Sequence, residues 1–347
     1  MSPSEPRPGR DLAVVVLVAA LVFWGVDLAV RPVAPPQHLP EVQEGMADLQ
    51  ASDPHVLVLG SSYGRAFWAV KDELARLTGG ERHLAAVAVE HGKLSVYEWI
   101  LQNRILPVLD ATDASGRRQR TRLQHFVLVT EWWDSLPYGE GDPGANLPAL
   151  GWTLDHFLAD VARVGINQFN RNYLQKRWRR LFHDFALVQD RGFHTLIDSV
   201  RAALVGRIRP ELRPEAVAAR LEASTQLLEE SIRGLGHAEQ MRAWRSILST
   251  MRARGVEVTI VLYPTMPAKR TQAGVATLER FHALAAGVAA EHGARLVDLS
   301  QWAPILDTDF GADCDHLTAE GDAKFARLGL AGPLAFLRNG ASSERVR

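Results

Sequence analysis

Hydrophobic residues gather in five short continuous runs that predict buried β-strands. They cover residues 55–60, 83–90, 125–132, 257–264 and 294–300. Most of these runs lack the alternation of polar and apolar residues expected of a strand with one face in water. They therefore favour a parallel sheet that is covered on both faces. Segments with the helical spacing of apolar residues lie between the runs, so the chain predicts a three-layer α/β/α domain.

The alternation is interrupted between the third and fourth predicted strands. From residue 138 to 240 the sequence contains no convincing buried strand and many charged residues in helical patterns. We interpret residues 138–240 as a mostly helical insertion in a domain that spans 55–337 and is followed by a tail at 338–347. We expect the insertion to pack beside the carboxyl edge of the sheet.

A different hydrophobic run lies near the N-terminus. Residues 12–26 carry no charge, and the apolar character continues to residue 30 with Asp27 as its acid. A helix of about 20 residues spans a bilayer, so residues 12–30 predict a transmembrane anchor. A buried core helix and a cleaved signal peptide are the alternatives.

The residues around this run predict its orientation. Arg7 and Arg10 precede it, and the positive-inside rule then puts residues 1–11 in the cytoplasm. The catalytic domain of such a single-pass protein would lie outside the cytoplasmic (inner) membrane. The proline-rich sequence that follows the anchor predicts an extended tether over residues 31–54.

Composition and charge narrow the class of protein. The chain has 347 residues, of which 47% are hydrophobic and 23% charged, so it can bury a sizeable core. A net charge of −1 gives no sign of a nucleic-acid partner. The single cysteine, Cys314, excludes an intrachain disulfide. The histidines are scattered without metal-ligand spacing, so we expect no metal site.

Two serines follow the first predicted strand. Sites in open α/β sheets form at the carboxyl ends of strands, and Ser62 occupies that position just before a predicted helix. The N-terminus of a helix offers free N–H groups and a partial positive charge, which suit an oxyanion. Ser62 is therefore a candidate nucleophile, with a simple turn and helix cap as the alternative interpretation.

A second candidate segment, "GADCDHLTAEG", lies near the C-terminus. Asp313 and His316 are three residues apart, which lets the carboxylate reach Nδ1 while Nε2 faces a serine, as in a catalytic triad. Asp315 is adjacent to His316, and backbone geometry makes it the poorer orienter. The segment is also typical of a helix start with Thr318 as N-cap, and this interpretation is compatible with a catalytic triad.

Together, "VLVLGSS" and "DxxHLTxxG" resemble the blocks of the SGNH/GDSL hydrolase superfamily over about residues 55–135 and 240–335. The resemblance implies a mostly parallel, flavodoxin-like sheet. It matches Ser62 to the nucleophile, His316 to the base and Asp313 to its orienter. It also matches Gly92, after the second strand, to an oxyanion donor that acts beside the N–H of Ser62.

Two departures from the family pattern affect the site. Ser61 stands where the family has an aspartate, and "TEWWDS" replaces the block that supplies an asparagine as third oxyanion donor. Glu131, or an indole N–H of Trp132 or Trp133, is a candidate to line the site instead. Aromatic packing at a strand end is the alternative.

Three further residues are candidates to line the site. Ser61 neighbours the nucleophile, His91 precedes Gly92, and Arg65 is placed to steer an anionic polymer. For Arg65 and His91, an ordinary solvated position is the alternative.

The layout also resembles one branch of the superfamily. The anchored proteins of teichoic-acid D-alanylation share the G-S-S block and the N-terminal membrane helix, and alginate O-acetylation proteins share the topology. This resemblance implies an extracytoplasmic serine esterase or O-acyltransferase that needs no cofactor. Its substrate would be an acylated polysaccharide or other envelope ester, and a membrane-bound acyltransferase is a candidate partner. An inactive binding or assembly protein on the same scaffold is the alternative, and it is motivated by the two departures from the family pattern.

Overall fold

The computed structural model describes residues 40–89, 92–112, 115–116, 122–137 and 214–339, with positions 18, 21–22, 158–159, 161–162 and 165. The sheet and the helices that surround it belong to one compact unit, Leu39–Ala145 with Ala202–Arg347. Among the described residues, no helix is both long and apolar enough to cross a bilayer. The expected anchor at 12–30 and the tail at 338–347 lie almost wholly outside the described residues.

Five parallel strands form the sheet, and they confirm the predicted α/β architecture. In chain order they are β1 (Val56–Ser61), β2 (Leu84–Val89), β3 (His125–Thr130), β4 (Glu257–Leu262) and β5 (Arg295–Asp298). Their spatial order is β2-β1-β3-β4-β5, the flavodoxin-like order. Every residue of β1, β2 and β3 is buried, as expected for continuous apolar runs between two helical layers.

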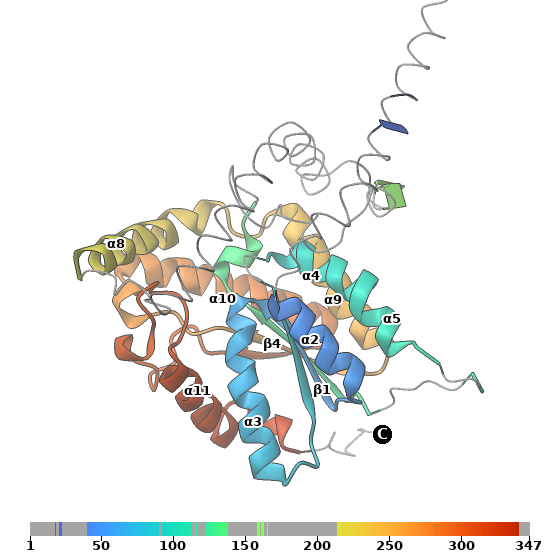
Figure 1. The fold of residues 1–347 in the computed structure, drawn as a ribbon. Helices are drawn as coiled ribbons and strands as arrows, with labels where there is room; N and C mark the ends of the chain where they lie inside the picture. Colours follow the sequence, from blue (N-terminus) through green and yellow to red (C-terminus); the bar gives the residue numbers. More distant parts are fainter. Residues whose placement is uncertain are drawn as a thin grey trace, which may run out of the picture. The chain divides into compact units, whose positions relative to one another are not determined.

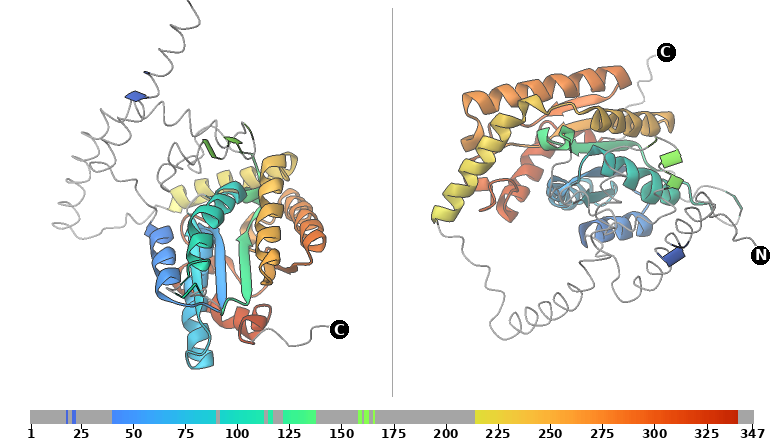
Figure 2. Two further views of the ribbon diagram at one scale, coloured as in Figure 1. Left: turned by 90° about the vertical axis from the view of Figure 1, so that its right-hand side faces the viewer. Right: turned by 90° about the horizontal axis from the view of Figure 1, so that it is seen from above.

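Helices cover both faces of the sheet (Figures 1 and 2). On one face α3 (Ala66–Thr78) packs beside α11 (Ala319–Ala331), where the rings of Phe67 and Phe325 are 5.8 Å apart. On the other face α9 (Ala238–Ala253) packs against α10 (Gln272–His292), with the rings of Trp244 and Phe281 5.9 Å apart. Helix α4 (Leu94–Ile100), the π-turn Leu101–Ile105 and α5 (Leu106–Leu109) complete this second layer.

Short 3-10 helices occupy several loops. They are η1 (Ser62–Arg65), η3 (Trp132–Ser135), η6 (Ser231–Arg233), η7 (Pro267–Lys269), η8 (Asp307–Asp309) and η9 (Ala335–Leu337). Of these, η1, η3 and η7 follow β1, β3 and β4 directly or closely. They therefore lie at the carboxyl edge of the sheet, where a site is expected.

Helix α2 corrects the expected tether. Residues 31–54 were expected to be extended, but Pro40–Ala51 form α2. Its buried residues Val42, Met46 and Leu49 follow helical spacing. At Gly45 an added Cβ would lie 2.3 Å from the carbonyl oxygen of Ala86, so the absence of a side chain lets α2 approach β2 closely. The compact unit thus begins before residue 55.

Helix α8 (Pro214–Glu230) lies within the expected insertion. It is mostly exposed and contributes Leu228 to the core. The Thr271 hydroxyl at the start of α10 donates a hydrogen bond to Glu229 at 2.5 Å, which connects α8 to α10. Apart from a few isolated positions, residues 138–213 of the expected insertion lie outside the described residues.

Candidate active site

The site is built at the point where β1 becomes η1. Gly60 is required there because an added Cβ would lie 2.7 Å from the carbonyl oxygen of Val129 on neighbouring β3. Ser61 ends the strand and caps η1, since its Oγ accepts the N–H of Tyr63 at 3.4 Å. Ser62 follows as the first residue of η1 and is only 6% exposed. The chain thus presents Ser62 at the carboxyl edge, where helix N-termini leave N–H groups unpaired.

A short loop before α11 presents His316 to the same edge. The N–H of Gly311 donates to the carbonyl of His316 at 2.7 Å and closes the loop. Thr318 caps α11, with its hydroxyl accepting the N–H of Gly321 at 3.1 Å, so the N-cap expectation for Thr318 is confirmed. Helix capping therefore fixes the loop that holds the imidazole.

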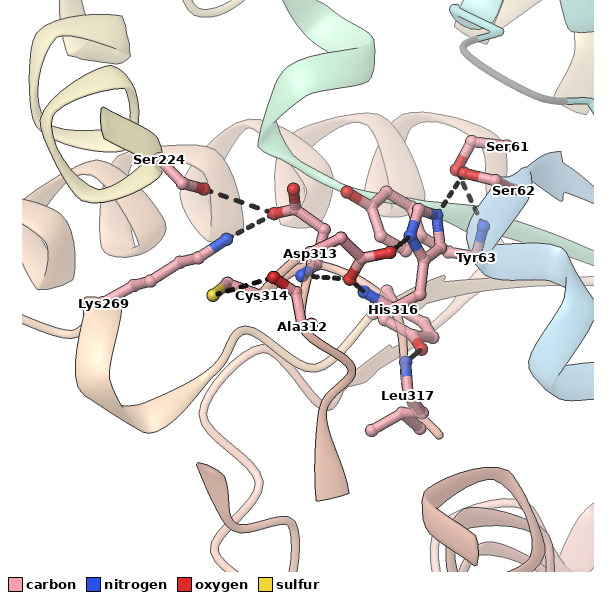
Figure 3. Close-up of polar contacts among 12 residues, drawn as sticks. Ser61, Ser62, Tyr63, Ser224, Lys269, Ala312, Asp313, Cys314, His316 and Leu317 are labelled. Atoms are coloured by element: carbon pink, nitrogen blue, oxygen red, sulfur yellow. Dashed lines mark hydrogen bonds and ion pairs between the residues drawn. The ribbon is translucent and has the colours of Figure 1, made fainter. Parts of the chain in front are cut away.

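Ser62, His316 and Asp313 form one chain of hydrogen bonds (Figure 3). The distance from His316 Nε2 to Ser62 Oγ is 2.6 Å, and that from His316 Nδ1 to Asp313 Oδ2 is 2.9 Å. With Nδ1 protonated and donating to the carboxylate, Nε2 is left to accept the Ser62 proton. The three residues thus have the nucleophile–base–orienter geometry of a serine hydrolase.

The carboxylate of Asp313 is held in its charged form. Its Oδ1 accepts the backbone N–H groups of Asp315 and His316, both at 3.0 Å. Burial by itself raises the pKa of Asp313, but the hydrogen bonds from the His316 side chain and these two amides outweigh it and hold the pKa well below its usual 3.8. Asp313 can therefore stabilise an imidazolium without taking up the proton itself.

Asp315 serves a different partner, as the sequence had indicated. It forms an ion pair with Lys269, whose side chain is 5% exposed, and it accepts a hydrogen bond from Ser224 of α8 at 3.3 Å. Between the two aspartates, Cys314 adopts a left-handed backbone conformation with φ of 61° and is buried. Burial also raises the pKa of the Cys314 thiol, so the thiol is not activated as a nucleophile.

A small pocket that is open to solvent lies beside this chain of hydrogen bonds. Its walls are residues from the loops after β1, β3 and β4 and from the His316 loop: Tyr63, Glu131, Trp132, Pro264, Thr265, Met266, Lys269, Cys314 and Asp315. The pKa of Glu131 is raised well above its usual value, first by burial and then by the carboxylates of Asp134 and Asp315. Burial beside two other carboxyl groups therefore favours the protonated form of Glu131, whose side chain lines the pocket.

A second group of buried polar residues lies behind the pocket. Asp134 is fully buried and accepts the N–H of Glu131 at 3.2 Å. Burial raises its pKa to about 7, although the Glu131 amide, Thr130, Tyr97 and Lys93 oppose the increase. Lys93 donates to the carbonyl of Pro137 at 2.7 Å and lies 4.4 Å from the ring centroid of Trp133. Trp133 therefore packs on Lys93, whereas Trp132 lines the pocket.

Gly92 does not offer the free donor that the family resemblance implied. Its N–H donates to the carbonyl of Val89 at 2.9 Å, and its own carbonyl accepts the hydroxyl of Tyr97 at 3.0 Å. An added Cβ at this position would lie 2.5 Å from the ring of Tyr97. The glycine is thus needed for close packing, and its amide is already bonded within the turn after β2.

Two of the remaining candidates have different outcomes. Arg65 ends η1 as a half-buried residue, and its charge lowers the pKa of Asp322, which burial raises to about 6. Arg65 therefore interacts with the first turn of α11. His91 lies outside the described residues. In the described part of the chain, no group of three or more His, Cys, Asp or Glu side chains is arranged to hold a metal ion.

Sequence reasoning missed four residues that build the site: Tyr63, Ser224, Tyr263 and Lys269. The ring of Tyr63 stacks on His316, and the hydroxyl of Tyr263 accepts the N–H of Leu317 at 3.4 Å. Tyr63 follows the nucleophile directly and Tyr263 is the last residue but one of the fourth apolar run, so their positions gave a usable signal. Lys269 and Ser224 gave none, because they lie in a loop and on a polar helix.

Comparison with known proteins found structures that align with this chain but no matching family or sequence. No protein-family description matches the chain, and no curated protein matches its sequence. An α/β hydrolase from the metagenome of Lake Arreo, Spain, aligns with 12% identity over 82% of this chain and 96% of its own, at a TM-score of 0.37. A lipase/acylhydrolase from Enterococcus faecalis aligns with 12% identity over 80% of this chain and 96% of its own, at a TM-score of 0.34. A catalytic mutant of an acetylxylan esterase from Geobacillus stearothermophilus aligns with 8% identity over 81% of this chain and 94% of its own, at a TM-score of 0.39.

Proposed function

We propose that this chain is a serine esterase of the SGNH type. The observation that carries the proposal is the pair of hydrogen bonds through His316, 2.6 Å to Ser62 Oγ and 2.9 Å to Asp313 Oδ2. A serine hydroxyl is a weak nucleophile by itself and becomes effective when a base takes its proton. The short Ser62–His316 contact supports this activation.

The proposed reaction proceeds in two steps. Ser62 Oγ attacks the carbonyl carbon of the ester while its proton moves to His316 Nε2, and Asp313 stabilises the resulting imidazolium. The tetrahedral intermediate collapses, the alcohol leaves with the proton from His316, and the acyl group stays on Ser62. Water, or the hydroxyl of an acceptor, then gives its proton to His316 and attacks the acyl-enzyme, which releases the acid or a new ester and restores Ser62.

The proposed oxyanion site differs from the one that the resemblance implied. The N–H of Ser62 lies at the start of η1 and is suited to bind the developing negative charge. The Gly92 amide is bonded to Val89, so a second donor has to come from elsewhere. Glu131 lines the adjacent pocket and burial raises its pKa, and a protonated carboxyl group can donate a hydrogen bond, so we assign the second donor to Glu131.

We further propose that the esterase domain is anchored in the inner membrane and acts outside the cytoplasm on acyl esters of a cell-envelope polymer. The uncharged run at residues 12–26 supports the anchor. Transfer to a polymer hydroxyl, with a membrane-bound acyltransferase as partner, belongs to the same proposal. The contact between Ser224 of α8 and Asp315 supports a role for the insertion near the acceptor.

An inactive binding or assembly protein is the second candidate. Two observations favour it: the Gly92 amide is already bonded, and "TEWWDS" supplies no asparagine to the oxyanion site. Loss of one oxyanion donor typically costs about 10² to 10³ in rate, so two losses would leave a poor catalyst.

A fluorophosphonate probe separates the two candidates. The probe forms a covalent bond with an activated serine, so an esterase should be labelled at Ser62 and should hydrolyse p-nitrophenyl acetate. The matched control variant is S249A, because the Ser249 hydroxyl also lies close to an imidazole, 3.3 Å from His292 Nδ1 on the exposed surface. S249A should be labelled like the wild type. Labelling that persists in S62A, or no labelling of a folded wild type, would reject the esterase.

A further inference from the structure

Four aromatic rings form a column that ends on His316. Phe325 and Tyr263 have ring centroids 6.2 Å apart, Tyr263 and Tyr63 4.6 Å, and Tyr63 and His316 5.0 Å. The Tyr63 ring and the imidazole are stacked, with 24° between their planes. Phe325 is fully buried in the core and Tyr263 nearly so. The column therefore connects the imidazole to the rigid interior of the domain.

The hydrogen bonds of His316 are made at the edge of the imidazole. Asp313 holds Nδ1 and Ser62 holds Nε2. Contacts at the edge of a ring restrain its tilting less than a group packed against its face does. A planar group against the ring face does resist it, and Tyr63 is stacked there.

Tyr63 is itself held at several points. Its backbone N–H donates to Ser61 Oγ, its ring packs on Tyr263, and its phenol interacts with the carboxyl of Glu131. Burial, followed by the nearby carboxyl group of Glu131, raises the pKa of Tyr63 well above its usual 10.0, so the phenol stays protonated. The ring is thus fixed before any substrate binds.

Tyr263 supports the same loop from a second direction. Its hydroxyl accepts the N–H of Leu317, the residue after His316, at 3.4 Å. One tyrosine therefore holds the imidazole face and the other holds the adjacent backbone. Both come from loops at the carboxyl edge of the sheet, after β1 and β4.

We propose that Tyr63 is a positioning residue, which acts through His316 by stacking on its imidazole and keeping it aligned for proton transfer from Ser62. The inference rests on the proposed esterase function. An aromatic face also attracts a cation within about 6 Å of its centroid, so the stack favours the imidazolium that forms during the reaction. Misplacement of a reacting group by about 1 Å can cost about 10²-fold in rate.

The test compares four variants of the full-length chain. Y63L removes the ring, Y63M replaces it with a flexible side chain that still fills space, and Y63F removes the hydroxyl alone. W302L is the matched control, because Trp302 packs on Phe325 at 6.0 Å in the same aromatic cluster without contacting His316. Circular dichroism establishes folding, and kcat, KM and the fluorophosphonate labelling rate are measured for every variant.

We expect Y63L and Y63M to lower kcat and the labelling rate together by about 10- to 100-fold with KM unchanged. Y63F should lose less than Y63L and Y63M, since it keeps the ring and removes only the contact of the phenol with Glu131, and W302L should keep the wild-type kcat. Wild-type kcat in folded Y63L or Y63M would overturn the inference. A loss in Y63F as large as that in Y63L, or an equal loss in W302L, would also overturn it.

A second measurement does not depend on activity. In protein labelled with ¹³C-histidine, the His316 signal is identified by its absence from H316Q. Its ring proton should be shifted upfield by the Tyr63 ring in wild type and Y63F, and should lose that shift in Y63M. An unchanged signal in Y63M would overturn the stacking role. Hydrolysis by S62A at the wild-type rate would instead reject the esterase, while the NMR comparison would still decide the stacking.

Discussion

The hydroxyl of Ser62 and the imidazole of His316 are 2.6 Å apart, although 254 positions separate the two residues in the chain. Strand β1 carries one to the carboxyl edge of the sheet, and the loop before α11 carries the other. Helices α3 and α11, which follow these two residues, pack side by side. The contact between nucleophile and base therefore depends on the packing of the first and last parts of the domain.

Replacement of either residue by alanine should abolish ester turnover. Members of a triad act as a unit, so S62A and H316A should each lower kcat by about 10⁴- to 10⁶-fold, and the double variant should be little worse. Hydrolysis of p-nitrophenyl acetate measures the effect. S61A should be much milder, because Ser61 caps η1 with a long hydrogen bond of 3.4 Å.

The control for these variants is S249A, which removes another serine hydrogen bond to a histidine and should keep full activity. If S61A loses turnover and S62A retains it, the assignment of the nucleophile is wrong by one residue. If both retain wild-type turnover, the observed hydrolysis does not arise at this site.

Asp313→Asn should lower kcat by about 10⁴-fold while the protein stays folded. An amide in this position favours the wrong tautomer of His316, so Nε2 no longer accepts the Ser62 proton.

Because the folded-state pKa of Asp313 lies below 3.8, its ionised form stabilises the fold above that pH, and this contribution is lost as the pH falls through the folded-state pKa. Urea unfolding should show D313N less stable than wild type at pH 7, with the gap closing in acid. A gap that widens in acid would contradict this assignment.

Asp134→Asn should show the opposite dependence on pH. The folded protein keeps a proton on Asp134 up to about pH 7, whereas the unfolded chain releases it near 3.8. Between these values the free energy of unfolding of the wild type therefore falls as the pH rises. Relative to wild type, D134N should gain stability between pH 4 and 7 and then level off. Urea unfolding at pH 4, 5.5 and 7.5 tests this, and a relative stability of D134N that does not change with pH would refute the raised pKa.

The proposed anchor predicts the location of the C-terminus. A reporter fused after Arg347 and active only outside the cytoplasm should be active in cells that express the full chain, and its activity should disappear when residues 12–30 are deleted. Full activity of a second reporter, of a kind active only inside the cytoplasm and fused at the same point, would reject the anchor orientation and the envelope substrates with it.

Much of the fold was predictable because parallel strands buried on both faces must be apolar throughout. The run Val56–Ser61 is buried at every position, and such a run leaves few alternatives to a central strand. Helix α2 was missed because prolines precede it and obscure its pattern. Its buried Val42, Met46 and Leu49 repeat at intervals of four and three residues, which was a usable signal.

The site was predictable where the chemistry depends on residue type and local spacing. Asp313 and His316 lie in one loop, so their contact follows from three positions of separation. The direction of the Gly92 amide was not predictable, because it depends on the turn that bonds it to Val89. Lys269 contacts Asp315 across 46 positions of sequence, and no local pattern indicates such a pairing.

The left-handed conformation of Cys314 has a consequence for the whole loop. Only one residue stands between Asp313 and Asp315, yet their carboxylates contact different partners, the imidazole of His316 and the ammonium group of Lys269. The residue between them has a φ of 61°, a backbone conformation that is costly for branched side chains. A position without a chemical role of its own therefore sorts two like charges to separate tasks, and its tolerance to substitution is set by backbone shape and not by the reactivity of its sulfur.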